Sequence, residues 1–185
     1  MTTLVTDQIK EQLAGLIREV PDFPVPGVSF KDITPLIASP GGLAKAVEAL
    51  VRLSPSEIDT VLGVEARGFV FASPVALSLG AGFVPVRKPG KLPSKVIETK
   101  YELEYGSETL AIHSDALSPG DRVLLVDDVL ATGGTIAAAA DLIKTAGAEL
   151  VGVTVLIELD YLGGRQRLAE HGIVDVVSVL NYPEP

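Results

Sequence analysis

Two adjacent carboxylates, Asp127 and Asp128, follow a run of four apolar residues and precede a run of small and hydroxyl residues. The apolar run, residues 123–126, predicts a buried strand, and residues 131–135 predict a loop that opens a helix. In open α/β sheets, ligands bind outside the carboxyl ends of the strands. We therefore expect this segment to bind a ligand.

The loop after the carboxylates suits a phosphate group. Its residues are Ala131, Thr132, Gly133, Gly134 and Thr135. No bulky side chain keeps an anion from the backbone, and successive N–H groups can converge on it, assisted by the positive end of the following helix. The carboxylates would repel a phosphate, so they are expected to serve another part of the same ligand. A sugar phosphate suits both parts of the segment: its phosphate can bind in the loop, and its hydroxyls can donate to Asp127 and Asp128.

The charge of the chain limits its partners. With 15 basic and 24 acidic residues the net charge is −9, whereas proteins that bind nucleic acid present a basic face. An acidic chain that binds a sugar phosphate must gather its cations locally. Four of them fall within residues 87–95, namely Arg87, Lys88, Lys91 and Lys95. Alone, this segment reads equally as a solvated loop; beside a phosphate loop, an anion-binding role is favoured.

Arg67 is a further candidate at the same edge. It follows the apolar residues 60–64, and if these form a strand of the same sheet, Arg67 lies near the two carboxylates. An arginine in such a loop is either a surface cation or a residue that binds pyrophosphate. The second role is chemically suitable, because the planar guanidinium offers several donors that fit phosphate oxygens.

Two other residues have both a plain and a functional interpretation. Glu104 lies near the tip of a predicted hairpin; it is either a solvated side chain or the carboxylate of a loop that closes over a ligand and exchanges a proton with it. Phe30 lies in a segment framed by proline and glycine; it belongs either to the core or to a stacking surface for a planar base.

The elements that must position these residues alternate along the chain. Buried apolar strands separated by helices indicate an α/β fold with a mostly parallel sheet covered on both faces. Its 185 residues suit one domain, with residues 1–34 as a small N-terminal lobe. Strands are predicted at 60–64, 83–86, 123–126, 151–157 and 174–180, less regular strands at 95–101 and 108–113, and helices at 7–20, 40–53, 69–79, 134–145 and 164–170.

Composition narrows the chemistry. The chain has no cysteine, which excludes disulfides, thiolate catalysis and zinc–thiolate sites. No apolar run approaches the ~20 residues of a membrane span, and the N-terminus lacks the pattern of a signal peptide. We expect a cytoplasmic protein without membrane or nucleic-acid partners. His113 and His171 are isolated and lack metal-ligand spacing.

Together these segments resemble the adenine phosphoribosyltransferase family. Residues 123–135 resemble the signature of type I phosphoribosyltransferases, which use 5-phosphoribosyl-1-pyrophosphate (PRPP). Three segments narrow the resemblance to the adenine branch: Phe-Lys-Asp-Ile-Thr-Pro at 30–35, Val-Arg-Lys-Pro-Gly-Lys-Leu-Pro at 86–93, and Leu-Glu-Tyr-Gly at 103–106. Matches at 21–27 and 65–69 extend it along nearly the whole chain.

The resemblance implies an activity and an architecture. Members transfer the 5-phosphoribosyl group from PRPP to N9 of adenine, which yields AMP and pyrophosphate, with Mg²⁺ held mainly by the substrate's phosphates and no metal site of the protein's own. The implied fold is a type I phosphoribosyltransferase domain over residues 1–185, with residues 1–34 as a hood and 93–107 as a flexible flap. A homodimer is also implied.

The resemblance also implies a role for each candidate. The loop 131–135 would hold the 5′-phosphate, and Asp127 and Asp128 the ribose hydroxyls. Glu104 would be the catalytic carboxylate at adenine N7, and the peptide bond between Glu65 and Ala66 would be cis. The pyrophosphate would lie with Arg67, Lys88 and Lys91, and with Arg87 across a dimer interface. Adenine would stack on Phe30, with its edge read by backbone groups of Ser29 and Lys31.

Two alternatives remain open at this point. A phosphoribosyltransferase for guanine, hypoxanthine, xanthine or orotate would keep the signature at 123–135 but lack the hairpin motif at 103–106. A PRPP-sensing regulator would bind the ligand without catalysis; it would need a DNA-binding domain, for which the 34 N-terminal residues, with no basic helix, are too few.

Overall fold

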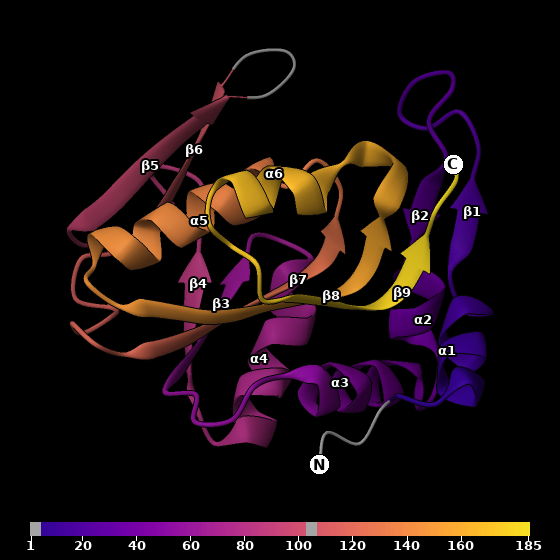
Figure 1. The fold of residues 1–185 in the computed structure, drawn as a ribbon, viewed down its shortest axis with the longest axis horizontal. Coiled ribbons are helices and arrows are strands. Elements are labelled where there is room, and N and C mark those ends of the chain that lie inside the picture. Colours follow the sequence, from indigo (N-terminus) through magenta and orange to yellow (C-terminus); the bar gives the residue numbers. More distant parts are fainter. Residues whose placement is uncertain (1–4, 103–106) are drawn as a thin grey trace.

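The computed structural model describes residues 5–102 and 107–185. Its centre is a five-stranded parallel sheet in the order β4-β3-β7-β8-β9 (Figure 1). The strands are β3 (Thr60–Val64), β4 (Gly82–Val86), β7 (Arg122–Leu130), β8 (Glu149–Leu159) and β9 (Val176–Tyr182). The predicted α/β fold class is therefore confirmed. The largest difference in this sheet is that β7 continues through both carboxylates to Leu130 instead of ending at Val126. Strand β8 is longer than predicted at both ends, and β9 begins and ends two residues later than predicted.

The strand order reverses at the centre of the sheet. The chain passes from β3 outward to β4, returns to β7 on the other side of β3, and then continues to β8 and β9. Pairing between β3 and β7 ends at Gly63 and Val126, so the loop after β3 and the end of β7 lie side by side. Open α/β sheets bind their ligands at such a switch point.

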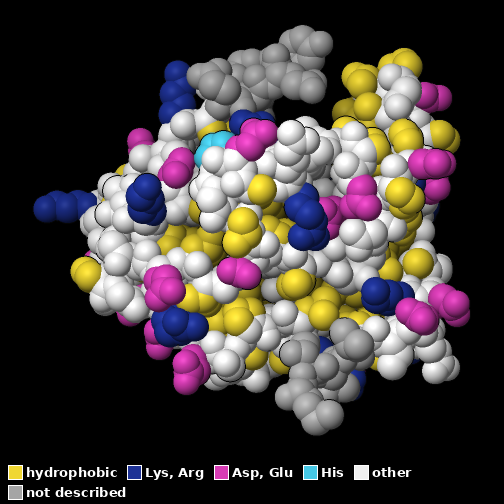
Figure 2. Space-filling view, in the orientation of Figure 1, with side chains coloured by type: hydrophobic (Ala, Val, Ile, Leu, Met, Phe, Trp, Pro, Cys, Tyr) yellow, Lys and Arg dark blue, Asp and Glu magenta, His cyan; other side chains and the backbone are white. Residues whose placement is uncertain are grey.

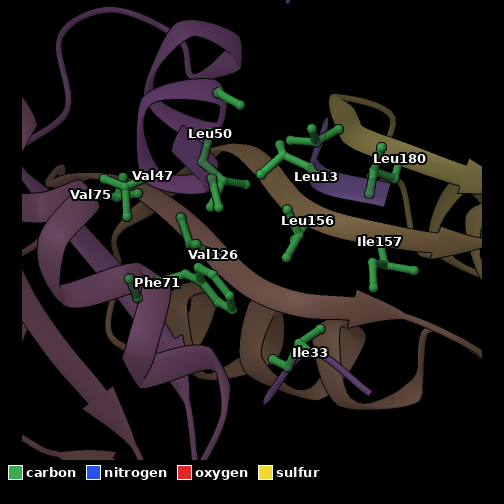
Figure 3. Packing of buried hydrophobic residues seen from close by; sticks show 14 of the residues in the cluster. Leu13, Ile33, Val47, Leu50, Phe71, Val75, Val126, Leu156, Ile157 and Leu180 are labelled. Atoms are coloured by element: carbon green, nitrogen blue, oxygen red, sulfur yellow. The ribbon is translucent and has the colours of Figure 1, made fainter. Parts of the chain in front are cut away.

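Two helix layers cover the sheet, as Figure 1 shows. Helices α3 (Gly42–Leu53) and α4 (Gly68–Leu79) pack on one face, and α5 (Gly134–Thr145) and α6 (Gly164–Glu170) on the other. Alternate strand residues divide between two cores, since successive side chains point to opposite faces. Val126 and Leu156 join Leu50 and Phe71 in the first core (Figure 3). The second core contains Leu62, Leu125, Val155, Ile136 and Leu142.

The N-terminal lobe lies beside β9 (Figure 1). It contains α1 (Asp7–Ala14), β1 (Arg18–Val20) and β2 (Phe30–Asp32), and α2 (Thr34–Ala38) leads from it into the rest of the chain. The helix predicted over 7–20 is therefore too long. Gly15 caps the helix after Ala14, and residues 18–20 pair with β2 as an antiparallel strand, a long-range contact that the helical spacing does not reveal.

An antiparallel ribbon lies on the other side of the molecule. Strands β5 (Val96–Glu102) and β6 (Ser107–His113) pair along their whole length and pack against α5. The one remaining element is a short 3₁₀ helix, η1 (Asp160–Leu162). Over the described residues of the face shown in Figure 2, acidic and basic side chains are interspersed. None of the described helices is long and apolar enough to span a membrane.

Candidate active site

A cavity of about 480 Å³ opens at the switch point between β3 and β7. Its walls are the loop after β3, the end of β7 and the loop that leads into α5, or residues 64–67 and 127–136. Arg67, both carboxylates and the whole of the small-residue loop thus line one cavity. The sequence places these segments 60 positions apart, and the β3–β7 pairing joins them.

The two carboxylates are buried in this cavity. Asp127 and Asp128 expose 7% and 5% of their surface. Asp127 Oδ1 accepts the backbone N–H of Asp128 at 2.9 Å. Burial, and then the neighbouring charge of Asp128, raise the pKa of Asp127 well above its usual range. Burial also raises the pKa of Asp128, although the nearby guanidinium of Arg67 opposes this. Ligand hydroxyls that donate to the pair would replace the hydration it has lost.

Arg67 connects the carboxylates to the N-terminal lobe. Its Nε lies 2.7 Å from Asp128 Oδ2, but the direction is not that of a hydrogen bond, so charge attraction holds the pair. Its guanidinium carbon lies 5.3 Å from the centre of the Phe30 ring, within cation–π range. The side chain is 44% exposed, which leaves donors free to meet an anion. The preceding Glu65–Ala66 peptide bond is cis, as expected from the sequence.

The small-residue loop is fixed by close packing. Gly133 has φ +80°, and a Cβ there would lie 2.8 Å from the carbonyl oxygen of Gly164. The position therefore requires glycine both for its conformation and for its contact. Gly134 begins α5, so the loop presents the unpaired N–H groups of a helix N-terminus to the cavity. The Arg167 side chain also packs against Gly134.

A second, mostly apolar cavity of about 310 Å³ adjoins the first. Arg67, Val129 and Ala131 line both. Its other walls come from the lobe and from the end of β8 with the segment that follows it, and include Ser29, Phe30, Lys31, Leu159 and Leu162. A planar apolar group thus has a place next to the polar cavity. Sequence reasoning missed Leu159 and Leu162, because nothing in their segment marks a site.

Lys31 lines this cavity, and its ammonium is held by contacts with neighbouring side chains. The side chain is buried, with Nζ 3.3 Å from Glu19 Oε1 and donating to Ser29 Oγ at 3.0 Å. Nζ also lies 4.9 Å from the centre of the Tyr182 ring. The lysine side chain therefore ties β1, β2 and β9 together.

The basic segment lies at the rim of the first cavity. Arg87 donates from Nε and Nη2 to the two oxygens of Glu65, at 3.2 and 3.3 Å, and these bonds lower the pKa of Glu65. Lys88 Nζ lies 3.0 Å from Glu108 Oε1, and Lys91 is exposed. None of the three lines the 480 Å³ cavity among the residues described. Glu104 lies outside the described residues.

Comparisons with known proteins agree on one family. The model of the phosphoribosyl transferase domain matches residues 36–180. Over 171 residues the chain is 63% identical to the adenine phosphoribosyltransferase of Cutibacterium acnes, a match that covers 92% of this chain and 97% of that protein.

Solved structures give the same result. The adenine phosphoribosyltransferase of Thermoanaerobacter pseudethanolicus is similar with a TM-score of 0.89 and 45% identity, over 94% of this chain and 99% of that one. The enzyme of Saccharomyces cerevisiae, complexed with D-DIAB and adenine, is similar with a TM-score of 0.88 and 38% identity, over 95% and 100%. The chain belongs to the adenine phosphoribosyltransferase family.

Proposed function

We propose that the two adjoining cavities are the site at which this protein transfers the 5-phosphoribosyl group of PRPP to N9 of adenine, which yields AMP and pyrophosphate. The observation that carries this proposal is the arrangement around Arg67. A buried carboxylate pair and a helix-opening loop lie on one side of it, and a mostly apolar cavity that contains Phe30 lies on the other. The reaction needs both: a place for a sugar phosphate and, beside it, a place for a planar base.

The first cavity would hold the sugar phosphate. The backbone N–H groups and hydroxyls of residues 131–135 would bind the 5′-phosphate, and Asp127 and Asp128 would accept from the ribose hydroxyls. Arg67 would bind the pyrophosphate with Lys88 and Lys91. Breaking the C1–O bond leaves positive charge on the ribosyl centre and negative charge on the pyrophosphate, and preorganised cations stabilise the latter.

The second cavity would hold adenine. The Phe30 ring would stack on the base, and backbone groups of Ser29 and Lys31 would bind its hydrogen-bonding edge. Leu159 and Leu162 supply apolar surface in the same cavity. Glu104 would exchange a proton with N7 as N9 attacks C1 of the ribose.

Mg²⁺ would arrive on the phosphates of PRPP and offset charge on the leaving group when bound. Asp127 forms no ion pair among the described residues, so one hard oxygen donor beside the ribose position is compatible with such a cation. No described cluster of three or more acidic or histidine side chains forms a metal site, and a cation held mainly by the substrate needs none.

We further propose a single cytoplasmic domain over residues 1–185, with residues 1–34 as a hood over the base and 93–107 as a flap. The ribosyl centre must be kept from water, which would hydrolyse it.

The test of the whole proposal is PRPP-dependent release of pyrophosphate with adenine, guanine, hypoxanthine and orotate offered separately. Pyrophosphate should be released with adenine and with none of the other three bases. Release with one of the other bases but not with adenine would contradict the proposal.

Replacing Asp128 with alanine is expected to weaken PRPP use by about 1–3 kcal/mol, the range of charge-assisted hydrogen bonds. The change removes both the acceptor for ribose and the partner of Arg67. Steady-state kinetics with varied PRPP measure the effect, and Asp115→Ala, at an exposed turn, is the control. Wild-type kinetics in Asp128→Ala would show that the acidic pair does not bind ribose.

We also propose that the protein is a homodimer that uses the exposed apolar face of α3 and α4. Leu77 is 83% exposed, and next to it α3 and α4 frame a hollow lined mainly by apolar residues, including Leu43, Val47, Val51 and Pro74. Burying one leucine contributes about 1.5–3 kcal/mol, and a two-fold contact buries it twice.

Replacing Leu77 with glutamate is therefore expected to raise the dimer dissociation constant about tenfold or more, measured by sedimentation velocity. Val174→Glu is the control, because Val174 is 71% exposed on a different face. A wild-type protein that is a fully active monomer at assay concentration would refute both the dimer and a role for Arg87 in the partner's site. Within its own chain, Arg87 is bound to Glu65.

A further inference from the structure

Two residues to which no role has been assigned, Tyr101 and Glu108, form a chain of contacts between the two anion-binding parts of the site. Tyr101 and Glu108 face each other across the β5–β6 ribbon. The Tyr101 hydroxyl lies 3.0 Å from Glu108 Oε2 and 3.4 Å from Thr135 Oγ1 in the phosphate loop. The other carboxylate oxygen, Glu108 Oε1, accepts from Lys88 Nζ at 3.0 Å.

The protons in this chain can be assigned. The hydrogen bonds from Lys88 and then Tyr101 lower the pKa of Glu108, so its carboxylate is ionised at neutral pH and only accepts. Burial raises the pKa of Tyr101, which keeps the phenol protonated. The Tyr101 proton therefore goes to Glu108, and any proton between Tyr101 and Thr135 comes from the threonine.

This arrangement fixes the carboxylate relative to the site. The Tyr101 ring packs against the core on the α5 side of the sheet, and its hydroxyl is anchored at the phosphate loop. Glu108 is thereby held with one oxygen toward Lys88, and is more than a solvated partner of a surface lysine.

We propose that Glu108 competes with pyrophosphate for the ammonium of Lys88 and so lowers the affinity of the site for this leaving group. The inference rests on the proposed function, in which Lys88 binds pyrophosphate. A phosphate oxygen in contact with Lys88 would lie within about 6 Å of the Glu108 carboxylate, given the 3.0 Å Lys88–Glu108 distance and a similar one to the phosphate. Tyr101 is the positioning residue that holds Glu108 there.

Glu108 affects the binding of pyrophosphate in two opposite ways: it orders Lys88, and it repels the anion. The larger of the two effects decides whether Glu108 strengthens or weakens binding. By ordering Lys88, an exposed ion pair favours binding by a factor of at most about five. Two unit charges about 6 Å apart repel by a factor of about three in bulk water, and by more near a protein surface. Because pyrophosphate carries several negative charges, the repulsion exceeds the benefit. Glu108 therefore favours release of the product.

The experiment measures the binding of pyrophosphate with Mg²⁺, and of AMP, to the purified protein by titration calorimetry. Glu108→Gln, which keeps the size of the side chain and removes its charge, is expected to bind pyrophosphate about 3- to 10-fold more tightly, with AMP affinity unchanged within twofold. Glu98→Gln is the control: Glu98 is exposed on the same ribbon, and its variant should change neither affinity. In a Lys88→Gln background, the gain from Glu108→Gln should disappear.

Each other outcome overturns the proposal. Weaker pyrophosphate binding in Glu108→Gln would show that Glu108 helps Lys88 to bind the anion. Unchanged binding would show that the Lys88–Glu108 pair does not affect the release of pyrophosphate. A gain that persists without Lys88 would be a general charge effect. Altered AMP affinity would indicate a distorted loop. Wild-type turnover of adenine with PRPP tests the proposed function separately, because these comparisons use binding alone.

Discussion

Turnover is expected to fall by about 10²-fold or more when Glu104 is replaced by glutamine. The change keeps the size and polarity of the side chain but removes its ability to exchange a proton. In the proposed reaction, the proton at N7 of adenine must be transferred as N9 forms its bond to the ribose. Affinity for PRPP should change little, because the residue is assigned to the base.

The measurement is single-turnover kinetics with adenine and PRPP, so that product release does not mask the chemical step. Glu98→Gln is the control, because Glu98 is an exposed glutamate of β5 to which no role in the reaction is assigned. If Glu104→Gln turns over at the wild-type rate while chemistry limits the reaction, Glu104 is a solvated loop residue and the proton moves by another route.

The part of the site that the sequence predicts is the part that one βα unit supplies. The carboxylates and the loop 131–135 are contiguous with β7 and α5, so local pattern is enough to place them at a sheet edge. The helix over 134–145 has the predicted bounds, because Gly133 and Gly147 flank it in left-handed conformations that end regular structure.

The pairing of Arg87 with Glu65 depends on information that local pattern lacks. Val64 and Val86 are partners in the register of β3 and β4, which places the next residues, Glu65 and Arg87, side by side. Both residues stand out in the sequence as charged groups at strand ends, but only the register shows that they neutralise each other. The Tyr101–Glu108 pair likewise follows from the register of β5 and β6.

The residues that sequence reasoning missed belong to another unit of the chain. Leu159 ends β8, and Leu162 and Gly164 follow it; they reach the site because β8 lies next to β7 in the sheet. Apolar spacing predicts that these segments are buried or helical, but not which strand they accompany. The two glycines at 163 and 164 are the only local signal, since adjacent glycines before a helix suit a close backbone approach.

The close approach of Gly164 to the backbone of Ala131 gives the second prediction with a large expected effect. The substitution Gly164→Ala is expected to lower the affinity for AMP by about 10²-fold. A Cβ there would overlap the carbonyl oxygen of Ala131 and lie 2.8 Å from Leu130 Cδ1. Because the first obstacle is backbone, it cannot turn aside like a side chain, and the loop that binds the 5′-phosphate must move. A shift of about 1 Å in a positioned group costs about 10²-fold.

Calorimetric titration with AMP measures this effect, with the thermal unfolding midpoint determined in parallel. Gly163→Asn is the control, because Gly163 has φ +67° with nothing within 4 Å of its Cβ position, and asparagine tolerates that conformation. The control addresses the start of α6 without touching the loop. If Gly164→Ala binds AMP like the wild type, the contact between α6 and the loop does not set the geometry of the phosphate site, and the α5 N-terminus alone holds the anion.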